Sequence, residues 1–293
     1  MLPRHPSLRR ASAQGGIALI VVLWLLALLT LLATTVLTMS VAHRRAAASL
    51  GESIRARAII DGGIRLELLH LIAPPAAELG AAILNRQLQV LGTAVDLRIE
   101  RESGRLDLNT ANEGLLFAFF AANGWSEDNA HSMAARIADW KDPDDTPREG
   151  GAELQEYLAA GRRPGPRNGP FESVDELYQV LGSEAVSAEL MDSLTVYSHL
   201  PAPSPIAATP AVLRALTWAD QHQLEGKSWL AGAAGPLDAA SQPPSLIGQV
   251  IRVHACMSLR HQRFCRVVVM RLTGNPQTPF QVYLWSDSSS GGH

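Results

Sequence analysis

The sequence predicts an α+β fold in which a long N-terminal helix packs on an antiparallel sheet, with a large helical domain inserted between strands of that sheet. Three observations support this prediction: an uncharged apolar run near the N-terminus, two separate groups of alternating strand patterns, and a long stretch of helical character between them. The 293 residues can form one large domain or two modest ones. The net charge of -3 provides no general attraction for nucleic acid or an anionic membrane.

Residues 17–42 form the apolar run, and none of them is charged. A helix of this length measures about 39 Å at 1.5 Å per residue, which exceeds the roughly 30 Å hydrocarbon core of a bilayer. The sequence therefore predicts a single transmembrane segment over these residues. The alternative is a cleaved secretory signal, whose apolar region is usually only ~7–15 residues long.

A short basic leader, residues 1–16, precedes the apolar run and ends in Gly15-Gly16. Basic residues also follow the run directly, so charge alone does not fix the orientation in the membrane. The junction resembles a class III signal, which prepilin peptidases cut on the cytoplasmic side after the last glycine. This resemblance implies cleavage between Gly16 and Ile17, and a single-pass inner-membrane protein whose C-terminal region is periplasmic.

The fifth residue after this junction is Val21. Most pilins and pseudopilins have a glutamate at the fifth mature position, where its carboxylate can pair with the N-terminal ammonium of a neighbouring subunit. A carboxylate inside the membrane costs a few kcal/mol unless it is paired, so a subunit with no neighbour above it has reason to lack one. Among pseudopilins, a missing glutamate is a mark of the K-type subunit, which is thought to sit at the filament tip.

Beyond the membrane, residues 43–75 are rich in helix formers and predict that the first helix continues as far as Pro74-Pro75. Gly62-Gly63 are expected to soften it, at about 1 kcal/mol per glycine. The helical insert is predicted over residues 110–248. Within it Thr110 and Ser173 each precede a glutamate by three residues, which matches the capping box at a helix start. Ser126 is a third start, and the part after about residue 200 reads as a proline-rich linker and a degenerate second half.

The strands fall into two groups. Alternating residues at 95–100 and 106–108 predict a β-hairpin across the intervening Glu-Ser-Gly, within a first strand region at residues 76–109. Three further strands, at 251–257, 264–272 and 280–285, complete the sheet within residues 249–286. Residues 287–293 are predicted to be a disordered tail.

Three motifs follow one another in the insert and the strand before it: LDLNTANEGLL, IADWKDPDDTPREGGAELQEY and NGPFESVDELYQVLG. Downstream of a Gly-Gly signal without the fifth-position glutamate, they resemble general secretion pathway protein K, a minor pseudopilin of the type II secretion system. The resemblance implies a pilin-like sheet and a helix-hairpin-helix or SAM-like insert. It also implies a non-enzymatic tip subunit of the periplasmic pseudopilus, needed for pseudopilus assembly and for protein export across the outer membrane.

The same resemblance implies the partners. These are the I-type and J-type minor pseudopilins, the prepilin peptidase, the major pseudopilin and the inner-membrane secretion platform, with no nucleic acid among them. No enzyme motif is present: the sequence has no G-x-S-x-G elbow, no phosphate-binding G-x-x-x-x-G-K-[ST] loop and no H-E-x-x-H.

The alternative is a membrane-anchored helix-hairpin-helix DNA-binding protein of competence type. Such hairpins hold phosphate on backbone N–H groups of a glycine-apolar-glycine turn. The two candidate turns here, at residues 123–126 and 181–184, each lack the second glycine. Between Glu127 and Glu156 there are nine acids and three bases, a balance that repels a polyanion.

A candidate metal site lies in the acidic motif. Asp142, Asp144, Asp145 and Glu153 offer hard oxygen ligands on a chain that turns at Pro143 and Gly150-Gly151, and such ligands suit calcium. The spacing is not that of an EF-hand, and the alternative is a solvated acidic loop. The resemblance favours calcium, because K-type pseudopilins bind it in their helical domain. No organic cofactor is expected.

Cys256 and Cys265 are predicted to form a disulfide across the hairpin of the second strand group. A turn centred on residues 259–262 places the two cysteines opposite one another, where Cβ atoms lie ~4.5–5.5 Å apart. An oxidising periplasm favours the bond. Two unpaired thiols in a slipped register are the alternative, because strand boundaries read from sequence are uncertain by ~2–4 residues.

The Gly-Gly junction generates a first prediction. Replacing Gly16 with leucine should leave the leader attached, because the peptidase must accept a small residue at the cleavage position. Intact-mass analysis of the membrane-extracted protein measures this. A mature N-terminus near Ala46–Ala48 would instead show cleavage by an ordinary signal peptidase and contradict the class III reading.

Overall fold

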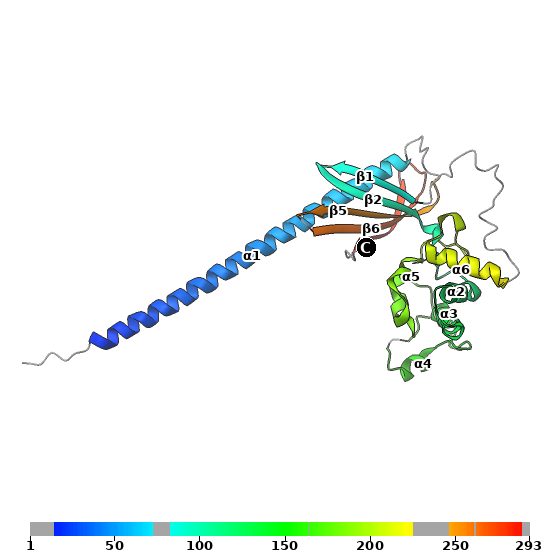
Figure 1. The fold of residues 1–293 in the computed structure, drawn as a ribbon, viewed down its shortest axis with the longest axis horizontal. Coiled ribbons are helices and arrows are strands. Elements are labelled where there is room, and N and C mark those ends of the chain that lie inside the picture. The colour runs from blue at the N-terminus through cyan, green and yellow to red at the C-terminus, as the bar shows by residue number, and fades with distance from the viewer. Residues whose placement is uncertain (1–14, 73–82, 164, 225–245, 261, 289–293) are drawn as a thin grey trace, which may run out of the picture. The chain divides into compact units, whose positions relative to one another are not determined.

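The computed structural model describes residues 15–72, 83–163, 165–224, 246–260 and 262–288. Within the chain two compact units separate at residue 55, and the second unit contains the sheet and the helical insert (Figure 1). Helix α1 runs from Gly15 to Ile72. The strands of the main sheet are β1 (Ile83–Val90), β2 (Thr93–Arg101), β5 (Val250–Leu259), β6 (Gln262–Leu272) and β7 (Phe280–Ser288).

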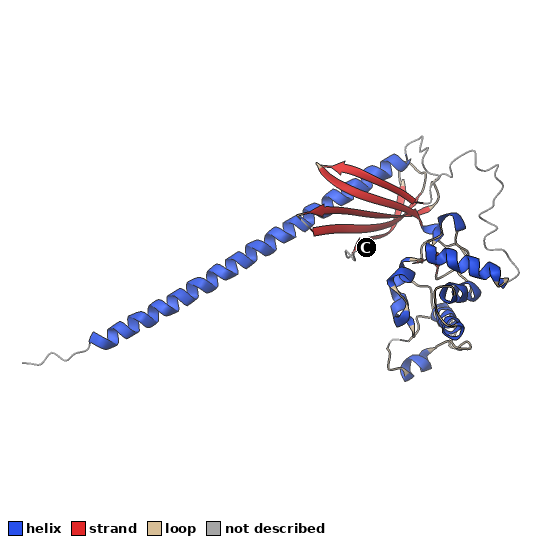
Figure 2. Cartoon of the chain, in the orientation of Figure 1, coloured by secondary structure: helices blue, strands red, loops and turns tan. Residues whose placement is uncertain are grey.

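The main sheet is antiparallel throughout, in the order β1-β2-β5-β6-β7. Figure 2 shows these strands gathered in one layer and the short helices of the insert gathered in a separate cluster. The insert enters after β2 and returns to the sheet at β5, so β2 and β5 are neighbours in space although about 150 residues separate them. The predicted α+β class, with a long helix on an antiparallel sheet and a helical insert, is confirmed.

The C-terminal part of α1 packs on one face of this sheet through a stripe of buried residues at helical spacing. Gly62 and Gly63 lie within this contact, and the helix continues through them. A Cβ on Gly63 would lie 3.2 Å from a methyl of Val95, and one on Gly62 would lie 3.4 Å from a methyl of Val90. The two glycines therefore permit a close approach of helix and sheet. The helix residues of this core are Ala56, Ile59, Ile60, Ile64, Leu68 and Leu71.

The predicted hairpin across Glu102-Ser103-Gly104 is wrong. Strand β2 pairs instead with β1, through a two-residue turn in which Leu91 has φ 50° and Gly92 has φ 77°. Positive φ at both turn residues is the geometry that matches the twist of a tight hairpin. Residues 102–104 form a short 3₁₀ turn, η1, and β3 (Leu106–Asp107) leaves the main sheet to pair in parallel with β4 (Leu194–Thr195) inside the insert.

Two other boundaries also differ from the predictions. Residues 287 and 288, which were predicted to lie in the tail, extend β7. Asp287 is held there by Arg57 of α1, with 2.7 Å between the charged atoms. The predicted leader, apart from Gly15 and Gly16, and the helix stop at Pro74-Pro75 lie outside the described residues.

The insert is built around its own core of buried apolar residues, separate from the helix–sheet core. Its aromatic residues pack closely, with Phe119 and Phe120 edge to face and Trp140 stacked on Phe171. Its helices are α2 (Glu113–Ala121), α3 (Glu127–Lys141), α4 (Leu154–Ala159), α5 (Ala188–Asp192) and α6 (Pro210–Gln221), with 3₁₀ turns η2 (Val174–Gln179), η3 (Ser183–Ala185) and η4 (Pro205–Ala207).

Helix starts follow the predictions only in part. Ser126 caps α3 by accepting the Asn129 N–H, as predicted. The capping box at Thr110 is wrong: Asn112 caps α2, because residues 109 and 110 are drawn into a turn around Asp107, and the Thr110 hydroxyl donates to the Leu200 carbonyl. Ser173 precedes η2 without a side-chain cap bond.

A buried ionic joint connects the insert to the sheet. Glu102, fully buried in η1, accepts two hydrogen bonds from Arg252 of β5, at 2.7 and 3.0 Å, and one from the Thr195 hydroxyl of β4 at 2.5 Å. Burial by itself would raise the pKa of Glu102, but the Arg252 guanidinium and its hydrogen bonds hold that pKa below its usual range.

A second arginine completes the joint. The Arg105 side chain is 2% exposed and donates to a carboxylate oxygen of Glu100 at 2.6 Å and to the Asp192 carbonyl at 2.7 Å. Nearby, Tyr197 of the insert stacks on Tyr283 of β7, with ring centroids 5.8 Å apart. Strands β2, β5 and β7 are thus each connected to the insert by a specific side-chain contact.

The proline-rich segment predicted as a linker is fastened over η1. The Ser204 N–H donates to the Ser103 carbonyl at 2.7 Å, and the Thr209 N–H donates to the Gly104 carbonyl at 3.2 Å. A Cβ on Gly104 would lie only 1.8 Å from the Ala207 carbonyl oxygen. Glycine is therefore required at residue 104 by the close approach of two backbone segments.

Replacing Gly104 with alanine should lower the free energy of unfolding by about 1–3 kcal/mol, because one of the two backbone segments must move. Urea unfolding of the full chain in detergent, followed by circular dichroism, measures the change. Gly169→Ala is the matched control, because its nearest atom lies 4.0 Å away. Equal stability of the two variants would show that the fastening contributes nothing.

Candidate functional site

A candidate membrane-spanning segment occupies the N-terminal part of α1. Leu19–Leu37 form a helical segment with a mean hydropathy of 2.7 and no buried residues, long and apolar enough to cross a membrane. Val21 lies in this segment and is half exposed. The backbone is helical from Gly15, so the Gly16–Ile17 bond lies in the first turn of α1.

The LDLNTAN motif is a structural turn at the entrance to the insert. The buried Asp107 carboxylate accepts from the Asn109 and Thr110 N–H groups with one oxygen, and from Ser198 and His199 with the other. It therefore joins the start of the insert to the chain leaving β4. Both carboxylate oxygens are used in this way, so Asp107 holds these two chain segments together.

Asn109 connects this turn to the GPF motif. Its amide donates to the Phe171 carbonyl at 3.0 Å, and its side-chain oxygen accepts the Phe171 N–H at 2.7 Å. The Lys141 ammonium closes the other side of the turn by donating to the carbonyls of Leu108, Asn109 and Ala111. Three motifs distant in sequence thus meet at one turn, which explains why they occur together.

The acidic motif folds around an arginine. Arg148 donates to Asp139 at 2.6 Å and forms a short ion pair with Asp142. Asp139 was not among the predicted site residues. It is fully buried at the end of α3 and also accepts the Ala152 N–H at 2.8 Å. A Cβ on Gly151 would lie 2.0 Å from an Asp139 oxygen, so the Gly-Gly of the loop lets the backbone close over this carboxylate.

Glu153 has an unusual environment for a carboxylate. It is 2% exposed and forms a capping box with Glu156 at the start of α4. Beyond this cap, neither of its carboxylate oxygens has a hydrogen-bond partner, and one oxygen of Asp142 has none either. Burial, together with the charges of Asp139 and Asp142, raises the pKa of Glu153 to about 7. A cation close to Glu153 would favour its ionised form.

The four predicted metal ligands divide into two pairs. Asp142 and Glu153 belong to the cluster with Asp139. Asp144 and Asp145 are exposed, and their carboxylates accept from the Thr146 N–H and the Asn168 amide within the loop. Among the described residues, no three His, Cys, Asp or Glu side chains are already arranged to hold a metal ion, and Arg148 occupies part of the space between the acids.

The two cysteines lie directly opposite one another on β5 and β6. The structure joins them in a disulfide between Cys256 and Cys265. Both are partly exposed on the sheet face opposite to α1, because their neighbours Ala255 and Met257 point into the helix–sheet core.

The two turns considered for DNA binding lie on one hollow. Gly124 and Gly182 both have positive φ, and they line this hollow together with Arg136. The Arg136 guanidinium donates to the Leu181 carbonyl at 3.1 Å. Glu127 and Asp128 are exposed at the start of α3, next to the first turn. Exposed acids beside this turn disfavour binding of a phosphate backbone.

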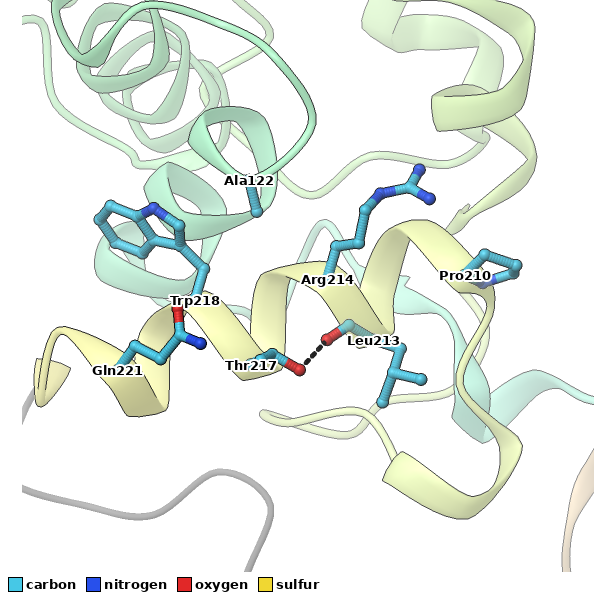
Figure 3. A pocket seen from close by; sticks show the side chains of 7 residues that line it. All are labelled: Ala122, Pro210, Leu213, Arg214, Thr217, Trp218 and Gln221. Carbon is cyan, nitrogen blue, oxygen red and sulfur yellow. Dashed lines mark hydrogen bonds between the residues drawn. The ribbon is translucent and has the colours of Figure 1, made fainter.

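A second hollow of about 500 Å³ lies along α6, where it passes the end of α2. Figure 3 shows Leu213, Thr217 and Gln221 following one side of α6. Arg214 is the charged residue of the lining, and it is ion-paired with Glu189 at 2.9 Å. This lining offers no pair of acid and base groups for catalysis.

Comparisons with known proteins agree with this fold. Residues 98–199 match the family model of the type II secretion system (T2SS), protein K. The crystal structure of the GspK-GspI-GspJ complex from the enterotoxigenic Escherichia coli type 2 secretion system contains a similar chain. The likeness covers 85% of this chain and 100% of that chain, with a TM-score of 0.60. At 15% identity this likeness shows a shared fold.

A comparison with curated proteins gives no match. The matched residues 98–199 contain the buried joint of Glu102 and Arg105, the Asp107 turn and the acidic loop. They extend from β2 to the residues just after β4. Residues 98–199 thus resemble protein K of type II secretion systems, and the fold of the chain agrees with that resemblance.

Proposed function

We propose that this chain is a non-enzymatic minor pseudopilin of a type II secretion system that caps the periplasmic pseudopilus and is needed for its assembly and for protein export. One observation carries the proposal: a protein K insert is fastened by a buried ionic joint to a sheet whose helix begins with an apolar anchor. The family is one of structural subunits. The proposed role of this chain is therefore to contact other subunits of the pseudopilus.

The anchor supports an inner-membrane position. In the proposal, prepilin peptidase removes the leader between Gly16 and Ile17, and the protein remains in the membrane until assembly. The Cys256–Cys265 disulfide favours a periplasmic location for the second unit, because such bonds persist in oxidising compartments.

Val21 supports the position at the tip. A pseudopilin within the filament gains from a fifth-position carboxylate that pairs with the next subunit's N-terminal ammonium. A valine there provides no partner for a subunit above, while it avoids the cost of a buried charge. The chain thus suits an end of the filament better than its interior.

Other minor pseudopilins are the proposed direct partners, because the similar chain of known structure lies in a complex with GspI and GspJ. The full chain in detergent should co-purify with the I-type and J-type pseudopilins of its own secretion system and retain them through gel filtration. The major pseudopilin alone is the control and should be retained less. A chain that binds none of these subunits but retards duplex DNA would support the helix-hairpin-helix alternative instead.

We further propose that the acidic loop binds calcium. Asp139, Asp142 and Glu153 carry three negative charges when ionised, and Arg148 carries one positive charge, which leaves two to be balanced by a divalent cation. The unpartnered oxygens of Glu153 and Asp142 are the first ligands to consider. Asp144 and Asp145, with exposed oxygens on the same loop, would complete the set. Bound calcium would hold the loop against α3 and the start of α4.

Calcium should raise the melting temperature of the metal-free full chain by roughly 5 °C or more at a concentration 100-fold above its dissociation constant. Chelator should reverse the effect. In Glu153→Gln the response should be lost or strongly reduced, whereas Glu149→Gln, an exposed acid of the same loop, should respond like the wild type. Differential scanning calorimetry measures all three. A wild-type melting temperature indifferent to both calcium and chelator would contradict the site.

A further inference from the structure

Both edge strands of the main sheet carry a charged residue on the side that faces α1, as does the central strand β6, whose Arg266 is ion-paired with Asp61 of α1. On the side of the sheet that faces α1, β2 and β5 present apolar residues only, from Val95 to Ile99 and from Ile251 to Met257. On the same side, each edge strand presents a charged residue that is ion-paired. The charged residues are Arg86 on β1 and Asp287 on β7.

Arg86 lies between Leu84 and Leu88, which pack against the helix–sheet core. Its Nε is 3.0 Å from an oxygen of Glu67 on α1. The Glu67 side chain is 1% exposed, whereas 36% of the Arg86 side chain remains exposed. The pair therefore consists of a buried carboxylate and a guanidinium that reaches from the core to solvent at the sheet edge.

At the opposite edge the charges are reversed, and neither Asp287 nor its partner Arg57 is buried. Asp287 lies 2.7 Å from Arg57 of α1 and 3.3 Å from Arg266 of β6, and its side chain is 46% exposed. At both edges, a charge on the helix-facing side is tied to α1 and remains in contact with water.

An edge strand exposes unpaired backbone N–H and C=O groups, and these can pair with a strand of another molecule. A strand added beside β1 would cover Arg86 with its own helix-facing side chains. The guanidinium would then lose its water, and the effective cost of desolvating an ion in a protein is several kcal/mol. An inward-facing charge is one of the ways in which natural sheets resist strand addition.

We propose that Arg86, held in place by Glu67, closes the β1 edge to strand addition by a second copy of this chain. In the described part of the chain no strand pairs with the outer side of β1. The proposal is independent of the assigned secretion function. It implies that contacts with other subunits form at surfaces other than this edge.

The test removes the charges while keeping the strand. In Glu67→Gln/Arg86→Leu, the helix-facing side of β1 becomes apolar and no unpaired charge is left buried. Sedimentation velocity of the full chain in density-matched detergent should show self-association at least tenfold tighter than that of the wild type. Hydrogen exchange should slow at alternate backbone amides of β1 in the associated form.

Two matched variants separate this effect from added hydrophobicity. Gln89→Leu places a leucine on the opposite face of the same strand and should remain like the wild type, as should Arg86→Lys, which keeps the charge. If the first double variant does not fold, Glu67→Gln/Arg86→Gln serves in its place. Wild-type self-association of the folded, charge-free variant, or equal association of Gln89→Leu, would overturn the proposal.

Discussion

The second unit depends on one buried ion pair, between Glu102 and Arg252. Glu102 stands where the chain leaves β2 for the insert, and Arg252 stands on β5 just after the chain returns. With Thr195 as a third member, the pair connects the exit strand, the return strand and the insert's own small sheet. Removal of one partner of such a pair typically costs about 3–5 kcal/mol, because the remaining charge stays buried. The position of the insert on the sheet therefore rests on electrostatics as well as on apolar packing.

The motif residues around this joint stabilise the fold by binding backbone groups of separate chain segments. Asp107 and Asn109 use their side chains to hold together segments from residues 107 to 110, 171 and 198 to 199. These are backbone partners of a turn that has no regular secondary structure of its own. Since buried N–H and C=O groups must be paired, short side chains with several acceptor and donor sites are needed at such a junction. In this chain the motif residues are the side chains that make this junction possible.

The acidic loop shows how burial changes a charged sequence. From the sequence, this run of acids can be either a metal site or a solvated loop. In the fold, α3 buries Asp139, the backbone closes over it at Gly151, and Arg148 is drawn inward as a counter-ion. One arginine does not balance the cluster, and the consequence is visible at Glu153, where burial and neighbouring acids raise the pKa. The loop thus combines a structural ion pair with carboxylate oxygens that have no partner inside the protein.

The anchor and the final strands were evident from the sequence, because both are decided by local patterns. A membrane helix needs only length and hydropathy, and β5, β6 and β7 are marked by alternation that places one face in the core. Cys256 and Cys265 are only nine positions apart in the sequence and flank a tight turn, so their opposition was also a local matter.

Other features were decided only by contacts between distant residues. The partner of β2 is β1, whose alternation is weak because Arg86 occupies an inward position that only Glu67 on α1 makes tolerable. The start of α2 was displaced to Asn112 because Asp107, held by residues 198 and 199, claims the N–H groups of residues 109 and 110. Asp139 was missed for the same reason: a carboxylate on a helix has no visible role until a loop folds over it. In each case the deciding term is the pairing of a buried polar group with a partner far away in the chain, and sequence spacing carries no information about that partner.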